Sequence, residues 1–150
     1  MGEALRRLTP AADLVVMCAA VADYAPEVLP GKRKKDGGDW LLRLLPTEDV
    51  LASLAQVPGR ERRVHVGFAL EVENGEEHAR IKLERKDLDL ICLNNPREEG
   101  CAFGSPTNRV TLLGRFGSRE ELPLLDKGHA ALEILRRVAR LLDGKLGPAR

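Results

Sequence analysis

The chain has 150 residues, a length that suits one α/β domain better than two. Hydrophobic residues make up 43% of it and charged residues 31%, which is typical of a globular protein with a packed core. Because the formal net charge is only +1, the chain as a whole attracts neither nucleic acid nor an anionic membrane, and we predict neither as a partner.

Two further features bear on where the chain works. No segment approaches the roughly 20 apolar residues that span a bilayer, and the first 20 residues do not have the pattern of a secretory signal. Cys18, Cys92 and Cys101 are odd in number and form no CxxC pair. We therefore predict reduced thiols and a cytoplasmic protein.

In chain order, residues 2–8 are predicted to form a short helix that Pro10 ends. Residues 13–20 are nearly all apolar, as expected for a strand that is buried on both faces of a parallel sheet. Residues 22–38 are rich in Gly and Pro and are predicted to be a loop. Residues 39–45 are predicted to be a strand that forms an exposed arm.

The next elements alternate between helix and strand. Thr47 resembles an N-cap, followed by acidic residues and an apolar helix. Residues 64–70 and 88–93 are predicted to be strands, and residues 74–85 a charged amphipathic helix between them.

After a loop rich in Gly, Pro and Asn, residues 109–113 and 121–125 are predicted to form a strand pair. The last helix is expected over residues 127–142, followed by a frayed tail. Alternating strands and helices indicate an α/β fold: a Rossmann-like three-layer αβα arrangement with a mostly parallel sheet, in a single domain over residues 1–150.

Several common signatures are absent from the sequence. Gly31–Lys35 lacks the upstream glycine and the final Ser/Thr of a Walker A motif, and no GxGxxG opens a helix. The chain contains no GxSxG segment. The three histidines do not have HExxH spacing, so we predict no metal site in the protein itself.

Two segments could hold a ligand at the end of the first long strand. Residues 19–24 (AAVADY) combine small side chains, which let a ligand approach the backbone, with the acceptor Asp23. The alternative is a tight turn with Asp as turn former. Residues 32–35 (KRKK) would bind a triphosphate if they closed over a cleft; the alternative is a solvated charge run.

Two later segments offer further candidates. In residues 66–69 (VGFA), Phe68 would flank a base, although phenylalanines at such positions are more often core residues. Lys82 and Lys86 are four residues apart and therefore share one helical face, and the strand after them ends at Asn94. Paired lysines on one face are also common on solvent-exposed surfaces.

Taken in order, the motifs AAVADY, KxKK, VGFA, KxxxKxLDLICxN and FGSxxN resemble bacterial phosphopantothenate–cysteine ligase, and the match runs from about residue 12 to residue 142. In many bacteria this ligase is the carboxyl-terminal half of a bifunctional flavoprotein. The resemblance implies CTP-driven activation of 4′-phosphopantothenate as an acyl-cytidylate, attack by the amine of cysteine, Mg²⁺ bound with the triphosphate, and no flavin in this part. It also implies a homodimer, for which residues 39–45 are the candidate contact.

The resemblance also implies roles for individual residues. Lys32 would be the catalytic lysine of a mobile flap. The nucleotide-binding residues would be Met17, Cys18, Ala19, Asp23, Lys32, Glu48, Asp49, Val50, Leu51, Phe68, Lys82 and Lys86. The substrate-binding residues would be Ala20 and Asn94.

The family's domain normally begins upstream with a strand and a Gly-rich turn, for which residues 1–12 offer no counterpart. We therefore expect a sheet that is incomplete at its amino-terminal side, and a partnership with the missing segment or with the decarboxylase part. The main alternative to a ligase is a non-catalytic remnant that binds nucleotide or only dimerises. A weaker alternative is an unrelated Rossmann-like oxidoreductase domain.

Overall fold

The computed structural model describes residues 1–32, 34 and 37–147. Its centre is a five-stranded sheet in the order β1-β4-β5-β7-β8. The pairs β1–β4 and β4–β5 are parallel, whereas β5–β7 and β7–β8 are antiparallel. The bounds are β1 Leu14–Met17, β4 Val64–Leu70, β5 Leu90–Asn94, β7 Thr111–Gly114 and β8 Arg119–Glu121.

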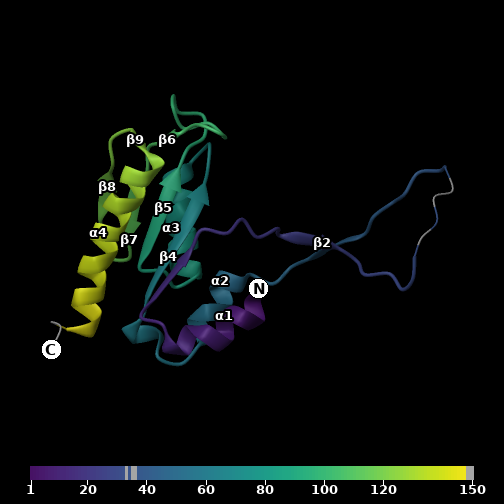
Figure 1. Cartoon of the computed structure of the whole chain (residues 1–150), viewed down its shortest axis with the longest axis horizontal. Coiled ribbons are helices and arrows are strands. Elements are labelled where there is room, and N and C mark those ends of the chain that lie inside the picture. Colours follow the sequence, from purple (N-terminus) through teal and green to yellow (C-terminus); the bar gives the residue numbers. More distant parts are fainter. Residues whose placement is uncertain (33, 35–36, 148–150) are drawn as a thin grey trace.

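Helices cover both faces of this sheet (Figure 1). Helices α1 (Gly2–Leu8), α2 (Val50–Ser53) and α3 (Gly75–Arg85) contribute to one core cluster, and α4 (Lys127–Leu146) contributes to a second. In the first cluster, Leu51 and Leu83 pack with Ile91. In the second, Val138 of α4 packs with strand residues that point to the opposite face. The predicted Rossmann-like three-layer α/β fold is confirmed.

Short elements complete the chain. Within the described part of the chain, three 3-10 helices cover Thr9–Ala11 (η1), Leu54–Gln56 (η2) and Arg60–Arg62 (η3). Strands β6 (Thr107–Asn108) and β9 (Leu125–Asp126) form a small antiparallel pair near the start of α4. None of the helices within the described residues is long and apolar enough to cross a membrane.

An arm leaves the body of the molecule between β1 and α2 (Figure 1). Its root is the antiparallel pair of β2 (Tyr24–Pro26) and β3 (Leu44–Pro46). The predicted arm is therefore present, but the strand begins at Leu44, later than the predicted start at residue 39. In the rest of the arm, the described residues form no regular element.

Strand β1 is shorter and more exposed than predicted. It covers four residues of the predicted eight, and Val16 is 39% exposed. The reason is its place at the edge of the sheet: among the described strands, β4 is its one neighbour. Other predictions also change: β2 lies inside the predicted loop of residues 22–38, β8 ends at Glu121 and α4 continues to Leu146.

Candidate functional site

A cavity of about 280 Å³ opens at the carboxyl ends of β1 and β4, where α2 begins and α3 ends. Ligands of open α/β sheets bind at this edge because the strands end there and the helix N-termini face it. Its lining residues are Met17, Ala19, Ala20, Val21, Asp23, Thr47, Glu48, Asp49, Val50, Leu51, Phe68, Lys82 and Lys86. The structure therefore brings the strand end near Asp23 and the lysine face of α3 to one place.

The start of α2 is held by Asp49. Its carboxylate accepts a hydrogen bond from the backbone N–H of Ala52 at 3.1 Å, which makes Asp49 the N-cap. The prediction that Thr47 caps this helix is wrong, because the Thr47 hydroxyl donates to the carbonyl oxygen of Ala22 instead. That bond joins the two loops that form the mouth of the cavity.

Lys86, which follows α3, pairs with the same Asp49. Its Nζ lies 3.0 Å from Asp49 Oδ2 and 3.1 Å from Asp49 Oδ1. The guanidinium of Arg85 lies 3.6 Å from Asp49 Oδ2. Partial burial would raise the pKa of the Asp49 carboxyl, but the bonds from Ala52 and Lys86 lower the pKa below its ordinary value. Asp49 is thus an ionised group inside the cavity.

Lys82, one turn earlier on α3, is held by a different carboxylate. Its ammonium group donates to Glu71, in the loop that follows β4. Nδ1 of His78 lies 3.5 Å from the other Glu71 oxygen. Burial would raise the pKa of Glu71, but the hydrogen bond and positive charge of Lys82 lower it. The sequence prediction missed Glu71. No local sequence pattern identifies a loop residue that contacts a lysine in the following helix.

The charges around the cavity come close to balancing. Its lining carries the carboxylates of Asp23, Glu48 and Asp49 and the ammonium groups of Lys82 and Lys86, which leaves one net negative charge. Glu48 is paired with Arg6 of α1 from outside. A polyanion entering this cavity therefore needs additional positive charge to neutralise it.

The remaining lining is small or apolar. Ala19 and Ala20 leave the backbone of the strand end accessible, as their position in the sequence suggests. Phe68, at the end of β4, is 43% exposed and lines the cavity, and it also borders the apolar surface on the α4 face of the sheet. An aromatic surface beside two cations suits a base with attached phosphates.

Three predicted site residues lie elsewhere. The Cys18 side chain lines a separate, apolar cavity of about 340 Å³ on the α4 face, because side chains alternate across the sheet at the end of β1. Asn94 ends β5 and does not line the main cavity. Its Oδ1 atom is buried and has no hydrogen-bond partner among the described residues.

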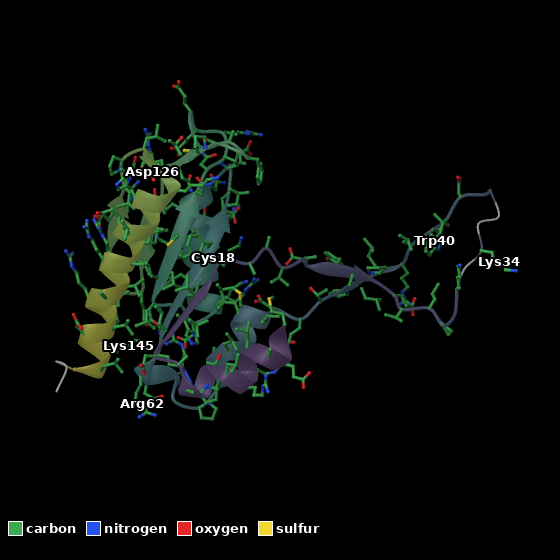
Figure 2. The ribbon with its side chains drawn as sticks, in the orientation of Figure 1. Cys18, Lys34, Trp40, Arg62, Asp126 and Lys145 are labelled. Carbon is green, nitrogen blue, oxygen red and sulfur yellow. The ribbon has the colours of Figure 1, made fainter. Side chains whose placement is uncertain are left out.

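Lys32 belongs to the arm and is not part of the cavity lining. Figure 2 shows Lys34 and Trp40 far out on the arm, well away from Cys18 in the body. Arg33 and Lys35 of the predicted basic run lie outside the described residues. The structure thus places the lysines of α3, but not the described lysines of the arm, at the cavity.

A metal ion held by protein side chains needs several donor groups close together. Within the described parts of the chain, no three His, Cys, Asp or Glu side chains are grouped to hold a metal ion. The cysteines Cys18, Cys92 and Cys101 are free thiols. Burial, together with a smaller effect of Cys18, raises the pKa of the Cys92 thiol to about 12, so it is protonated and unreactive at neutral pH.

Residues 1–142 match the family model described as the DNA/pantothenate metabolism flavoprotein C-terminal domain. A curated relative, the Coenzyme A biosynthesis bifunctional protein CoaBC of Bacillus subtilis (strain 168), is 39% identical over 142 residues. The match covers 94% of this chain and 34% of that protein, so the chain spans about a third of its relative.

Solved structures share the fold. The C-terminal domain of Coenzyme A biosynthesis bifunctional protein CoaBC superposes with a TM-score of 0.75 at 31% identity, over 95% of this chain and 61% of that one. The Cab2 mutant H337A in complex with phosphopantothenate-cysteine gives a TM-score of 0.64 at 18% identity, over 95% of this chain and 49% of that one. At that identity, the second likeness shows the fold alone.

Proposed function

Because this chain belongs to the DNA/pantothenate metabolism flavoprotein C-terminal domain family, we propose that it serves the ligase step of coenzyme A biosynthesis, in which 4′-phosphopantothenate is joined to cysteine. The CoaBC relatives carry coenzyme A biosynthesis in their name, and a protein with the same fold binds phosphopantothenate-cysteine. The nucleotide that drives the reaction is proposed to be CTP. As a ligase component, the chain would act in the cytoplasm, which its free thiols support.

One observation carries the proposal: Lys82 and Lys86 line the same cavity as the strand end around Asp23. In the proposed reaction, a carboxylate oxygen of phosphopantothenate attacks the α-phosphorus of CTP, and pyrophosphate leaves. The cysteine amine then attacks the acyl carbon, and CMP leaves. The first step brings two anions together, so the surrounding cations must reduce their repulsion.

The two lysines supply part of that charge. A lysine about 4 Å from a phosphate oxygen gains roughly 4 kcal/mol at an effective dielectric constant near 20, before desolvation is subtracted. Since the lining has one net negative charge, the lysines alone do not neutralise a triphosphate. We assign the remaining charge to Lys32, reaching in from the arm, and to Mg²⁺ carried by the triphosphate oxygens.

Mg²⁺ is compatible with this site, because it usually keeps several waters and needs only one or two carboxylates in addition to phosphate oxygens. Glu48, which also lines the cavity, is the carboxylate that would hold it. When bound, the ion would neutralise the phosphates and hold them for attack. Ala20 would let phosphopantothenate approach the backbone, and Asn94, with its unpaired Oδ1, is the second substrate-binding candidate.

The arm favours association with a second copy of the chain. Val28 and Leu41 are 93% and 94% exposed, and Tyr24, Trp40 and Leu44 are each more than half exposed. Exposed apolar side chains of this number are costly in water and are typical of interaction surfaces. We therefore propose a homodimer formed through the arm, with the part of the relatives' domain that precedes this region, or the decarboxylase part, as a further partner.

The nucleotide site is tested by titration calorimetry of the 150-residue chain with CTP and with ATP. Lys86→Ala removes a cation from the cavity lining, so we expect CTP to bind tenfold or more weakly, which corresponds to a loss of about 1.5–3 kcal/mol. Lys127→Ala, on α4, is the matched control and is expected to bind CTP like the natural chain. Equal affinity in both variants would remove Lys86 from the site.

A further inference from the structure

The two lysines of the cavity are held by carboxylates in different positions. Asp49, which pairs with Lys86, lines the cavity, and its side chain is 38% exposed. Glu71, which pairs with Lys82, does not line this cavity, and its side chain is 16% exposed. A ligand in the cavity therefore meets Asp49 directly but meets Glu71 only through Lys82.

Glu71 is itself held in place by neighbouring groups. Its backbone N–H donates to the carbonyl oxygen of Asn94 at 3.1 Å, which ties the loop after β4 to the end of β5. His78, on the same helix as Lys82, lies 3.5 Å from the second carboxylate oxygen. A carboxylate that is anchored in this way restricts the ammonium group of Lys82 to one direction, whereas an unpaired lysine side chain samples many rotamers.

Asp49 is placed differently. Its carboxylate occupies the space beside Lys86 that an incoming phosphate oxygen would take. It also has a structural role, because it accepts the hydrogen bond from the N–H of Ala52 that caps α2. An asparagine keeps that capping bond, since its side-chain oxygen is as good an acceptor, and removes only the negative charge.

We infer that Glu71 is a positioning residue that strengthens nucleotide binding by fixing Lys82 at the wall of the cavity, and that Asp49 weakens nucleotide binding by competing with phosphate for Lys86. This inference rests on the proposed function and deepens it, because it states what sets the affinity of that site. The advantage to the protein is a cavity whose lysines are ordered before the nucleotide arrives, so less side-chain entropy is lost on binding.

The two variants that test this inference have opposite expected effects. Simple charge arithmetic predicts that removing either carboxylate strengthens the binding of an anion. Positioning predicts that Glu71→Gln weakens CTP binding by about tenfold, because the anchored, charge-assisted bond is lost. Asp49→Asn is expected to tighten CTP binding by about threefold or more, because the competing charge is gone while the cap remains.

The experiment is calorimetric titration of CTP into the 150-residue chain and its variants, with the thermal unfolding midpoint measured for each. A double-mutant cycle separates positioning from a general structural effect: in a Lys82→Ala background, Glu71→Gln is expected to change CTP affinity by less than about twofold. If Glu71→Gln does not fold, Glu71→Asp, which withdraws the carboxylate by one methylene, is expected to weaken binding in the same direction.

Each outcome is decisive. Affinity in Glu71→Gln that is equal to or tighter than that of the natural chain overturns the positioning role, as does a full loss that persists in the Lys82→Ala background. Affinity in Asp49→Asn that is equal to or weaker than that of the natural chain overturns the competing role. If the natural chain itself gives no heat with CTP, the proposed nucleotide site fails, and this inference fails with it.

Discussion

His65 is a buried histidine whose environment keeps it neutral. Its side chain is fully buried in β4, and neither ring nitrogen has a hydrogen-bond partner among the described residues. Burial lowers its pKa to about 4, with the nearby guanidinium of Arg60 adding to the effect and Asp89 opposing it. Arg63 and Lys145 also lower the pKa, so charging the ring costs folding free energy.

The lowered pKa of His65 predicts that the stability of the folded chain decreases in acid. The pKa of His65 is about 4 in the folded chain and 6.5 ordinarily, so the unfolded chain binds more protons between these values. Stability should therefore fall as the pH falls from about 6.5 to about 4, by up to about 3 kcal/mol. Urea unfolding, followed by circular dichroism at pH 7.0, 5.5 and 4.5, measures this change in the free energy of unfolding. His65→Leu should lose clearly less stability over this range; an equal loss would exclude His65 as the cause.

At the scale of an element, the packing of the interior strand β4 depends on a glycine. A Cβ atom built on Gly67 would lie 2.7 Å from Leu88 Cδ1 and 3.3 Å from Leu51 Cδ2. Leu51 is in α2 and lines the main cavity. The missing side chain at position 67 therefore lets α2 pack close to β4, and this packing sets the position of the cavity wall.

Gly67→Ala is consequently expected to destabilise the chain by about 1–3 kcal/mol, because Leu88 and Leu51 must shift to make room for the methyl group. Gly144→Ala is the matched control. It lies within α4, nothing is within 4 Å of its added Cβ, and alanine favours helix, so a gain of about 0.5–1 kcal/mol is expected. Urea denaturation of both variants checks the opposite signs, and a loss in Gly144→Ala equal to that in Gly67→Ala would contradict the steric explanation.

At the scale of the whole molecule, the two ends of the sheet differ: one end holds a buried ion-pair network and the other holds the cavity. At the end opposite the cavity, the buried carboxylate of Asp89 lies 2.9 Å from an Arg60 nitrogen and 2.7 Å from Lys145 Nζ, and it accepts from the N–H of His65 at 2.8 Å. These contacts join η3, β4 and the last turn of α4. The network thus holds these elements together at one end of the sheet, while the cavity lies at the other end.

The proposed homodimer gives a prediction at the same scale. Replacing residues 27–43 by Gly-Ser-Gly keeps β2 and β3, whose pairing at Pro26 and Leu44 allows a short connection. This variant should be monomeric, because it lacks the exposed apolar side chains of the outer arm, among them Val28, Trp40 and Leu41, whereas the natural chain should elute as a dimer. Light scattering after size-exclusion chromatography measures both masses. A natural chain that is monomeric at tens of micromolar, or a variant that remains dimeric, would refute the arm as the contact.

Local sequence patterns were sufficient for much of the protein. Apolar runs and helical periodicity predicted β4, α3 and α4 within a few residues, and alternation of strand and helix predicted the α/β fold. The spacing of Lys82 and Lys86 placed them on one face, and the structure puts both at the cavity together with Asp23 and Phe68. These features were predictable because they depend on residues close together in the chain, whose periodicity is a local property.

Only the tertiary structure decided which groups meet. Glu71 is 11 residues from Lys82, and Asp49 is 37 residues from Lys86, so no local pattern pairs them. The half-exposed β1 follows from its place at the edge of the sheet, and the thiol of Cys18 faces α4 because of the strand's alternation. In the same way, the arm carries Lys34 away from the body of the molecule (Figure 2). Contacts of this kind depend on how strands and helices pack, and packing is a property of the assembled core rather than of any segment.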